Sequence, residues 1–305
     1  MIIALSGGIG GAKLALGLSH VLPPEELLII ANTGDDFEHY GLTICPDIDT
    51  LTYTLAGLDN PHLGWGRADE SWAFMQTLAA LGGPEWFRLG DRDLALHVLR
   101  SHRLHAGETL SVITDDVRKR FGIGLRILPM SDDPVRTQIN TDKGWLDFQD
   151  WFVRQRAEPL AQAVRFAGVE QARPQPALLD ALRAKPRGIV ICPSNPFISI
   201  EPILAVPGLR EAIKASGAPV VAVSPIIAGQ AVKGPTARMF EALGVTPSAA
   251  AVAARYGDLL HGFVMEHGDD AAGIAPRVFY ATTLMRDLAD KINLARQVVA
   301  AVDAL

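Results

Sequence analysis

The feature that most constrains the fold is a glycine cluster directly after the first apolar run, Ile2–Leu5. Four glycines fall within five positions: Gly7, Gly8, Gly10 and Gly11. A helix-compatible stretch begins at Lys13 and ends near position 18. Strand, glycine turn and helix in this order direct backbone N–H groups and a helix N-terminus at a phosphate. A tight turn without a ligand is the alternative, but the glycine density favours phosphate binding. The spacing matches neither the dinucleotide fingerprint nor the P-loop.

Short apolar runs alternate with helical patterns at both ends of the chain. The expected strands are 2–5, 27–31, 189–192, 220–223, 262–265 and 277–281. The expected helices are 13–20, 50–58, 207–215, 235–243, 248–256 and 287–302. Continuous apolar strands separated by helices predict a parallel sheet covered on both faces. The fold class is therefore α/β, a doubly wound Rossmann-like sheet whose ligand sits outside the carboxyl ends of the strands.

The middle of the chain has a different pattern, with mixed helices and a hairpin signature at Thr141–Gly144. We expect a Rossmann-like core made of residues 1–60 and 186–305. Residues 61–185 are expected to form an inserted α+β subdomain that caps the sheet.

Composition excludes several classes of function. The 305 residues carry a formal net charge of −6 and no long basic run, so a nucleic-acid partner is not expected. No apolar run is long enough to cross a membrane, and no signal peptide is recognisable. Two distant cysteines, Cys45 and Cys192, exclude a zinc-type spacing and suit a reducing compartment. We expect a cytoplasmic protein.

Acidic residues gather after the second expected strand. Four carboxylates lie in two short segments near the glycine turn: Asp35, Asp36, Asp47 and Asp49. Acids beside a phosphate-binding turn make sense if a divalent cation bridges them to phosphate oxygens, and Mg²⁺ favours such a site. The alternative is that Asp35 and Asp36 form a turn and Asp47 caps the following helix.

Further polar residues lie near helix starts or strand ends. Arg88 and Arg92 could contact an anion or a ring, or could form ion pairs with helix-capping acids. Ser194 and Asn195 follow the strand 189–192, and Lys233 lies in the loop after the strand 220–223. Their positions at strand ends favour ligand contact over ordinary turn chemistry.

Together these stretches resemble the 2-phospho-L-lactate transferase family of coenzyme F-420 biosynthesis. The resemblance rests on Leu5–Lys13, Asn32–Asp36, Pro46–Thr50, Leu89–Asp93, Pro193–Pro196 and Ser224–Pro235, in the family's order.

The resemblance implies a magnesium-dependent transfer. The ribityl hydroxyl of the deazaflavin precursor FO attacks a guanylylated donor of a phospho-three-carbon acid, and GMP leaves. By motif position, Asp49 and Arg88 contact FO, while the glycine turn and Ser194–Asn195 hold the guanosine diphosphate moiety. We expect Asp49 or Asp36 to orient or deprotonate the hydroxyl while others of the four aspartates hold magnesium.

The resemblance also suggests a homodimer. The identity of the transferred acid, whether phospholactate, phosphoenolpyruvate or phosphoglycerate, is left open by the sequence. A related family of nucleotide-sugar-binding regulators is the nearest alternative, and a dinucleotide-binding oxidoreductase is a more distant one.

Overall fold

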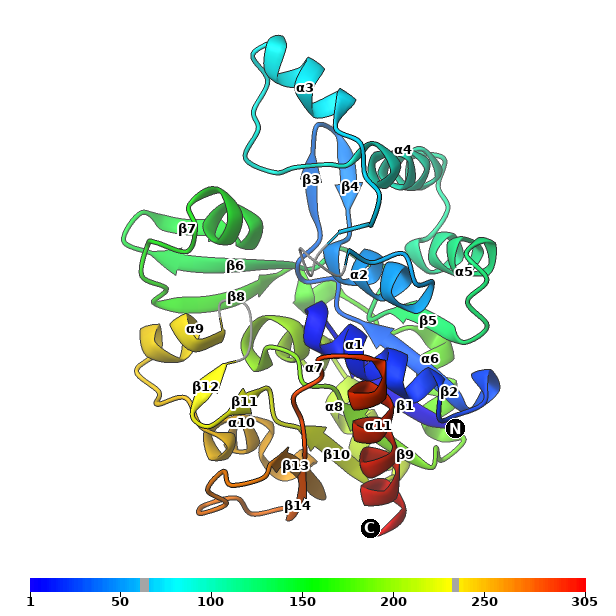
Figure 1. The fold of residues 1–305 in the computed structure, drawn as a ribbon, viewed down its shortest axis with the longest axis vertical. Helices are drawn as coiled ribbons and strands as arrows, with labels where there is room; N and C mark the ends of the chain where they lie inside the picture. The colour runs from blue at the N-terminus through cyan, green and yellow to red at the C-terminus, as the bar shows by residue number, and fades with distance from the viewer. Residues whose placement is uncertain (61–65, 232–235) are drawn as a thin grey trace.

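Seven strands form one parallel sheet, and the residues of its central strands are buried on both faces (Figure 1). The computed structural model describes residues 1–60, 66–231 and 236–305. In spatial order the strands are β14 (Arg277–Ala281), β13 (Gly262–Glu266), β10 (Val220–Val223), β9 (Gly188–Ile191), β1 (Ile2–Ser6), β2 (Leu27–Ala31) and β5 (Arg126–Pro129). The predicted α/β class with a doubly wound parallel sheet is confirmed, and the six predicted strands are present within a residue of their expected bounds.

β5 is the strand that the sequence pattern did not reveal. It pairs with β2 at the edge of the sheet, with Ile29 opposite Ile127. Arg126 interrupts its apolar run and Pro129 ends it, and a proline is tolerated at the end of an edge strand. Because β5 lies inside 61–185, part of that range belongs to the sheet. The predicted division into a core and an insertion stays a prediction.

Alternate residues of each central strand pack against helices on opposite faces of the sheet. Ile2 and Ala4 of β1 share a core with Leu14 and Leu294, whereas Ile3 and Leu5 face the opposite core. The first face is covered by α1 (Gly8–Ser19), α2 (Pro46–Leu55), α5 (Leu110–Arg120) and α11 (Leu288–Asp303). The second is covered by α6 (Pro176–Arg183), α7 (Glu201–Leu204), α8 (Leu209–Ser216), α9 (Thr236–Ala242) and α10 (Ala249–Tyr256).

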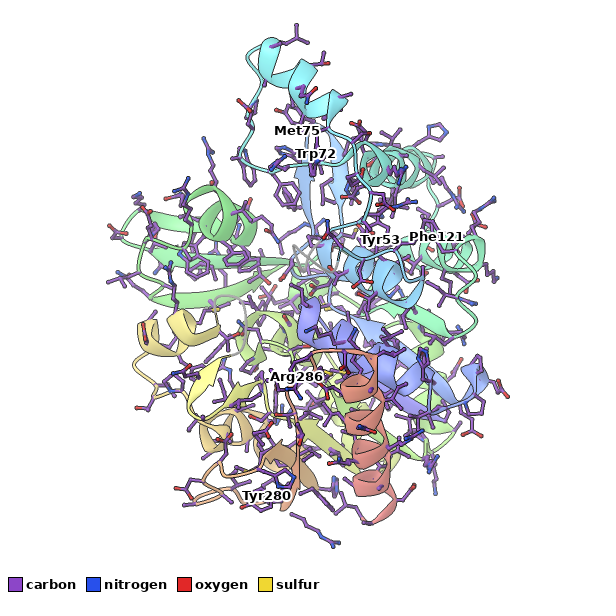
Figure 2. All side chains as sticks on the ribbon, in the orientation of Figure 1. Tyr53, Trp72, Met75, Phe121, Tyr280 and Arg286 are labelled. Atoms are coloured by element: carbon purple, nitrogen blue, oxygen red, sulfur yellow. The ribbon has the colours of Figure 1, made fainter. Side chains whose placement is uncertain are left out.

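Two smaller units stand above the carboxyl ends of the strands in Figure 1. The first, here called the arm, joins the hairpin β3 (Phe37–His39) and β4 (Leu42–Ile44) to α3 (Ala73–Ala80), and α4 (Asp91–His105) follows it. Its small core contains Ile44, Met75 and Leu89, with Trp72 packed against it (Figure 2). The second unit is an antiparallel sheet of β6 (Arg136–Thr141), β7 (Gly144–Asp147) and β8 (Ala163–Ala167).

Short elements complete the chain. They are β11 (Ile226–Ile227), β12 (Gln230–Ala231), η1 (Pro24–Glu26), η2 (Asp150–Arg154), η3 (Val169–Gln171), η4 (Pro196–Ile200) and η5 (Gly257–Leu259). None of the helices in the described parts of the chain has the length and apolar character needed to cross a bilayer.

Two helices begin earlier than predicted, and both differences shape the site. α1 begins at Gly8, not Lys13, so three of the four glycines lie in its first turn. α2 begins at Pro46, not Thr50, because proline is favoured in the first turn of a helix, where its missing N–H is not needed. Asp47 and Asp49 therefore lie inside the first turn of α2 and do not precede it.

Candidate active site

A cavity of about 840 Å³ lies where the glycine turn, α2, the arm and the β6–β8 unit meet. Ten of the predicted site residues line it: Gly7, Gly8, Gly10, Lys13, Asp35, Asp47, Asp49, Arg88, Ser194 and Asn195. Gly11 and Asp36 are buried behind this lining. Lys233 lies outside the described residues. The structure thus brings residues from distant parts of the sequence to the carboxyl end of the sheet, as expected for a doubly wound fold.

The glycines let α1 approach the neighbouring loop very closely. A Cβ atom on Gly10 would lie 2.2 Å from the carbonyl oxygen of Pro193, and one on Gly11 would lie 2.5 Å from Ser194 Oγ. Gly8 has a φ of +63°, in the left-handed region that favours glycine. The N-terminus of a twelve-residue helix is thereby brought to the cavity, which is the geometry that favours an anionic ligand.

Ser194 and Asn195 stabilise the glycine turn and the loop next to it. Ser194 Oγ donates to Gly7 O over 2.6 Å and accepts from Gly7 N over 3.2 Å. Asn195 Oδ1 accepts from Phe197 N and caps η4. Both side chains therefore have partners within the protein. The Ser194 hydroxyl and the Asn195 side-chain carbonyl fix the shape of the cavity beside the glycine turn.

Lys13 also reaches the cavity, from the second turn of α1. Its Nζ donates to the carbonyl oxygen of Met285 over 2.8 Å. This contact places a positive charge near the glycine turn.

One buried asparagine organises the acids beside the turn. Asn32 Nδ2 lies 2.9 Å from Asp47 Oδ2, 3.2 Å from Asp35 Oδ1 and 3.1 Å from Ile198 O. The other oxygen of Asp47 accepts from Gly8 N over 2.6 Å. An amide has two hydrogens for these three acceptors, so Asp35, Asp47 and Ile198 O share the donors of one side chain. Asp47 therefore ties α2 to the first residue of α1 and does not cap its own helix.

Burial makes the ionised forms of these acids costly. It raises the pKa of Asp47 to about 6. It also raises the pKa of Asp35 well above its ordinary value, and the neighbouring charge of Asp47 adds to this. Among the described residues, no positively charged side chain contributes to the pKa shift of Asp35. A buried pair of this kind suits a site that gains a cation.

Asp36 differs from its neighbour Asp35. Burial raises the pKa of Asp36 to about 7, although Arg136 and a hydrogen bond from Cys45 act in the opposite direction. Its Oδ1 has no hydrogen-bond partner in the described structure. Asp36 does not line the cavity, so it has no direct access to a ligand there.

Asp49 lines the cavity, and the guanidinium of Arg100 lies beside its carboxylate. Both of its carboxylate oxygens accept from the guanidinium of Arg100, and Arg100 Nη1 lies 3.0 Å from Oδ2. Both side chains are almost fully buried. This pair neutralises Asp49, whereas no ion pair to Asp35 or Asp47 is found within the described residues.

The arm supplies an aromatic wall to the same cavity. Trp86, Phe87 and Arg88 line it, and the Arg88 guanidinium lies 4.2 Å from the centroid of the Trp72 ring. A wall of this composition accommodates a planar ring through stacking and cation–π contact.

The alternative that Asp91 or Asp93 caps the helix that follows them is wrong, because neither side chain caps the start of α4. Asp91 accepts from Ala73 N and Phe74 N and so caps α3, while Glu70 accepts from Arg92 N and Asp93 N and caps α4.

Sequence reasoning missed Asn32, His97 and Arg100 as members of the site. The spacing of Asp93, His97 and Arg100, four and three residues apart, is the signal that could have indicated a polar helix face. Nothing in the sequence pairs that face with Asp49.

Comparisons with known proteins bear on the family of the chain and on its fold. The family model "2-phospho-L-lactate transferase CofD" matches residues 2–276. A protein named phosphoenolpyruvate transferase from Kitasatospora aureofaciens is 45% identical, covering 98% of this chain and 97% of its own. One of the same name from Streptomyces coelicolor is 43% identical, covering 97% and 96%. A Bacillus halodurans protein of the UPF0052 family has a TM-score of 0.63 at 14% identity, covering 97% of this chain and 98% of its own, and shows the same fold.

Proposed function

Because the chain belongs to the 2-phospho-L-lactate transferase family and is thus a transferase of coenzyme F-420 biosynthesis, we propose that it acts on a guanylylated donor and the deazaflavin FO. The ribityl hydroxyl of FO attacks the phosphorus atom nearest the three-carbon acid. A phosphodiester forms between FO and the acid, and GMP leaves with the electrons of the broken P–O bond. The names of the relatives favour phosphoenolpyruvate as the transferred group.

The observation that supports this proposal best is the division of the cavity into two chemically different parts. One part contains the glycine turn, the N-terminus of α1 and Lys13, which suit the phosphates of a nucleotide. The other contains the aromatic wall, Arg88 and Asp49, which suit a flat, hydroxylated acceptor. Phosphoryl transfer depends mainly on positioning and charge neutralisation, so such a cavity needs no covalent nucleophile.

Asp35 and Asp47 are the residues that would hold Mg²⁺. Their paired, buried carboxylates fit the preference of this ion for oxygen ligands, and it would neutralise charge on the phosphates when bound. Asp49 is left out of the set because Arg100 contacts both of its oxygens. Asp36 is left out because it does not line the cavity.

We assign the orientation of the attacking hydroxyl to Asp49 instead. A carboxylate fixed by two hydrogen bonds presents its remaining lone pairs in set directions, so it can accept a hydrogen bond from the hydroxyl.

A mass-spectrometric assay tests the function. Purified protein receives Mg²⁺, FO and one of three guanylylated acids: phosphoenolpyruvate, phospholactate or phosphoglycerate. We expect GMP and an FO phosphodiester, formed fastest from the phosphoenolpyruvate donor. Absence of product from all three donors, with folded protein and verified substrates, would contradict the proposal. Binding of a uridine sugar nucleotide in its place would then support the regulator.

Magnesium dependence has a separate test. Replacing one carboxylate of the pair, as in Asp47→Asn, should raise the Mg²⁺ concentration for half-maximal rate by at least about tenfold. Asp142→Asn, in the exposed turn between β6 and β7, is the matched control and should not change it. An unchanged Mg²⁺ requirement in Asp47→Asn would remove Asp47 from the ligand set. The cytoplasmic location and the homodimer stay predictions.

A further inference from the structure

Helix α4 directs a row of three polar side chains at α2. Asp93, His97 and Arg100 are spaced by four and three residues, which places them on one face of the helix. His97 and Arg100 are 1% and 3% exposed. Opposite them, α2 presents Asp49 and Tyr53, which are one turn apart. Figure 2 labels Tyr53 close to Phe121, whose ring lies beside it.

The side chains of this row contact one another without interruption. Tyr53 Oη donates to Asp93 Oδ1 over 2.6 Å, and Asp93 Oδ2 lies 3.1 Å from His97 Nε2. On the other side of the ring, His97 Nδ1 lies 3.4 Å from Arg100 Nη1 and 3.7 Å from Asp49 Oδ2. Arg100 then holds both oxygens of Asp49. The contacts therefore run from Tyr53 to the carboxylate that faces the cavity.

Helix α4 is also held by contacts to Thr43 of β4. Arg100 Nη1 lies 3.3 Å from Thr43 O, and Ser101 Oγ accepts from Thr43 N over 2.7 Å. These contacts fix α4 against β4. Arg100 is thus constrained by β4 as well as by α2.

We propose that Asp93, His97 and Arg100 form a positioning row that holds the Asp49 carboxylate in the orientation needed to meet the acceptor hydroxyl. The proposal rests on the proposed function, since it takes Asp49 as the acceptor contact. His97 and Arg100 act through Asp49. A buried carboxylate needs a cationic partner to be tolerated, and a reacting group needs fixed neighbours to keep its direction.

The same residues could be read as a metal site, because ligand atoms of Asp49, Asp93 and His97 lie within 4.8 Å of one another. The position of Arg100 argues against this reading. Its guanidinium contacts both oxygens of Asp49 and would repel a second cation at that distance.

The central test is His97→Gln in the active enzyme. Glutamine can replace the Nε2 contact with Asp93 but places no group at the Nδ1 position. We expect kcat to fall about 10- to 100-fold, with the KM for the guanylylated donor and the Kd for GMP within about twofold of wild type. His102→Gln, an exposed position on the same helix, is the control and should leave all these values unchanged.

The background Asp49→Asn separates a role through Asp49 from an independent one. If His97 acts through Asp49, His97→Gln should lower kcat by less than about twofold in that background, because the two effects are not additive. Arg100→Lys keeps the charge but loses the two-pronged contact, so it should lower kcat as well. Arg103→Lys, on the same helix, is its control.

Three results would overturn the positioning row. The first is a kcat of His97→Gln within twofold of wild type, and the second is an equal loss in the Asp49→Asn background. The third is weaker binding of Mn²⁺ alone to His97→Gln than to the wild type, as measured by calorimetry. That result would identify a metal site.

A crystal structure of His97→Gln tests the row without any assay. A rotated Asp49 carboxylate supports the proposal, and an unchanged one contradicts it. Lack of transferase activity in the wild type would be seen before any variant is compared. That failure concerns the proposed function and is distinguishable from failure of the row.

Discussion

Individual buried acids in this protein change the free energy of unfolding by an amount that depends on pH. Asp36 is the clearest case, because burial raises its pKa from 3.8 to about 7. The folded protein binds this proton more tightly than the unfolded chain does. The contribution of Asp36 to stability is therefore fully present below about pH 3.8 and is lost as the pH rises through about 7.

Asp36→Asn should remove this pH-dependent loss. Relative to wild type, the free energy of unfolding of the variant should increase steadily between pH 4 and pH 8, as measured by urea denaturation. Asp133→Asn is the control. Arg173 lowers the pKa of Asp133, so its contribution changes only at more acidic pH. A stability difference between Asp36→Asn and wild type that is constant over this range would contradict the assigned pKa.

Two glycines of α1 provide a second comparison at the level of residues. A Cβ on Gly10 would meet Pro193 O at 2.2 Å, and one on Gly17 would meet Lys291 O at 2.1 Å. Both alanine variants should be destabilised, because backbone atoms cannot move aside as a flexible side chain can. Only Gly10→Ala should also weaken GMP binding by at least about tenfold, as measured by calorimetry below the melting temperature. Equal loss of GMP binding in Gly17→Ala would show that the effect is not local to the cavity.

At the level of elements, α3 and α4 hold each other's N-termini. Asp91 of α4 accepts from two N–H groups of α3, and Glu70, which precedes α3, accepts from two N–H groups of α4. Carboxylates are favoured at such positions because they satisfy free donors and oppose the positive end of the helix dipole. This exchange fixes the start of α4, next to Arg88.

Removal of one of these caps should destabilise the arm. Glu70→Ala should lower the melting temperature by about 2–4 °C, the usual effect of losing a cap in a chain of this size. It should also raise the KM for FO, since Arg88 lies two residues before Gly90, the N-cap of α4. Glu158→Ala, at an exposed position, is the control. An unchanged melting temperature would mean that water replaces Glu70 without cost.

At the level of the whole molecule, the cavity is lined by three parts of the chain: the carboxyl end of the parallel sheet, the arm and the segment around η2 (Figure 1). In the proposed function, the donor side is built from the sheet and α1, and the acceptor side is built largely from the arm. Ligands on the two sides should therefore protect different parts of the chain.

Hydrogen exchange can detect this separation. GMP should protect residues 6–13 and 193–199, whereas FO should protect residues 84–90, because binding stabilises the local structure that it contacts. The fragment 209–216, covering α8 on the far side of the sheet, is an internal control. Protection of residues 84–90 by GMP alone would contradict the assignment of the two sides.

The sequence by itself determined most strands of the parallel sheet, the glycine turn and ten residues of the cavity lining. Runs such as Ile2–Leu5 and Leu27–Ala31 are apolar at every position, so their burial on both faces follows from local composition. The carboxyl ends of such strands meet at one edge, which is why Gly7, Asp35 and Ser194 could be assigned to one site before the structure was known.

Only the tertiary structure decided that Asp49 has a cationic partner. Asp49 and Arg100 are 51 residues apart in sequence and meet because the fold brings Arg100 of α4 beside Asp49 of α2. The same is true of β5, whose short run with a charged residue gains strand character from pairing with β2. These features depend on long-range packing, which sets the partners of a side chain independently of its sequence neighbours.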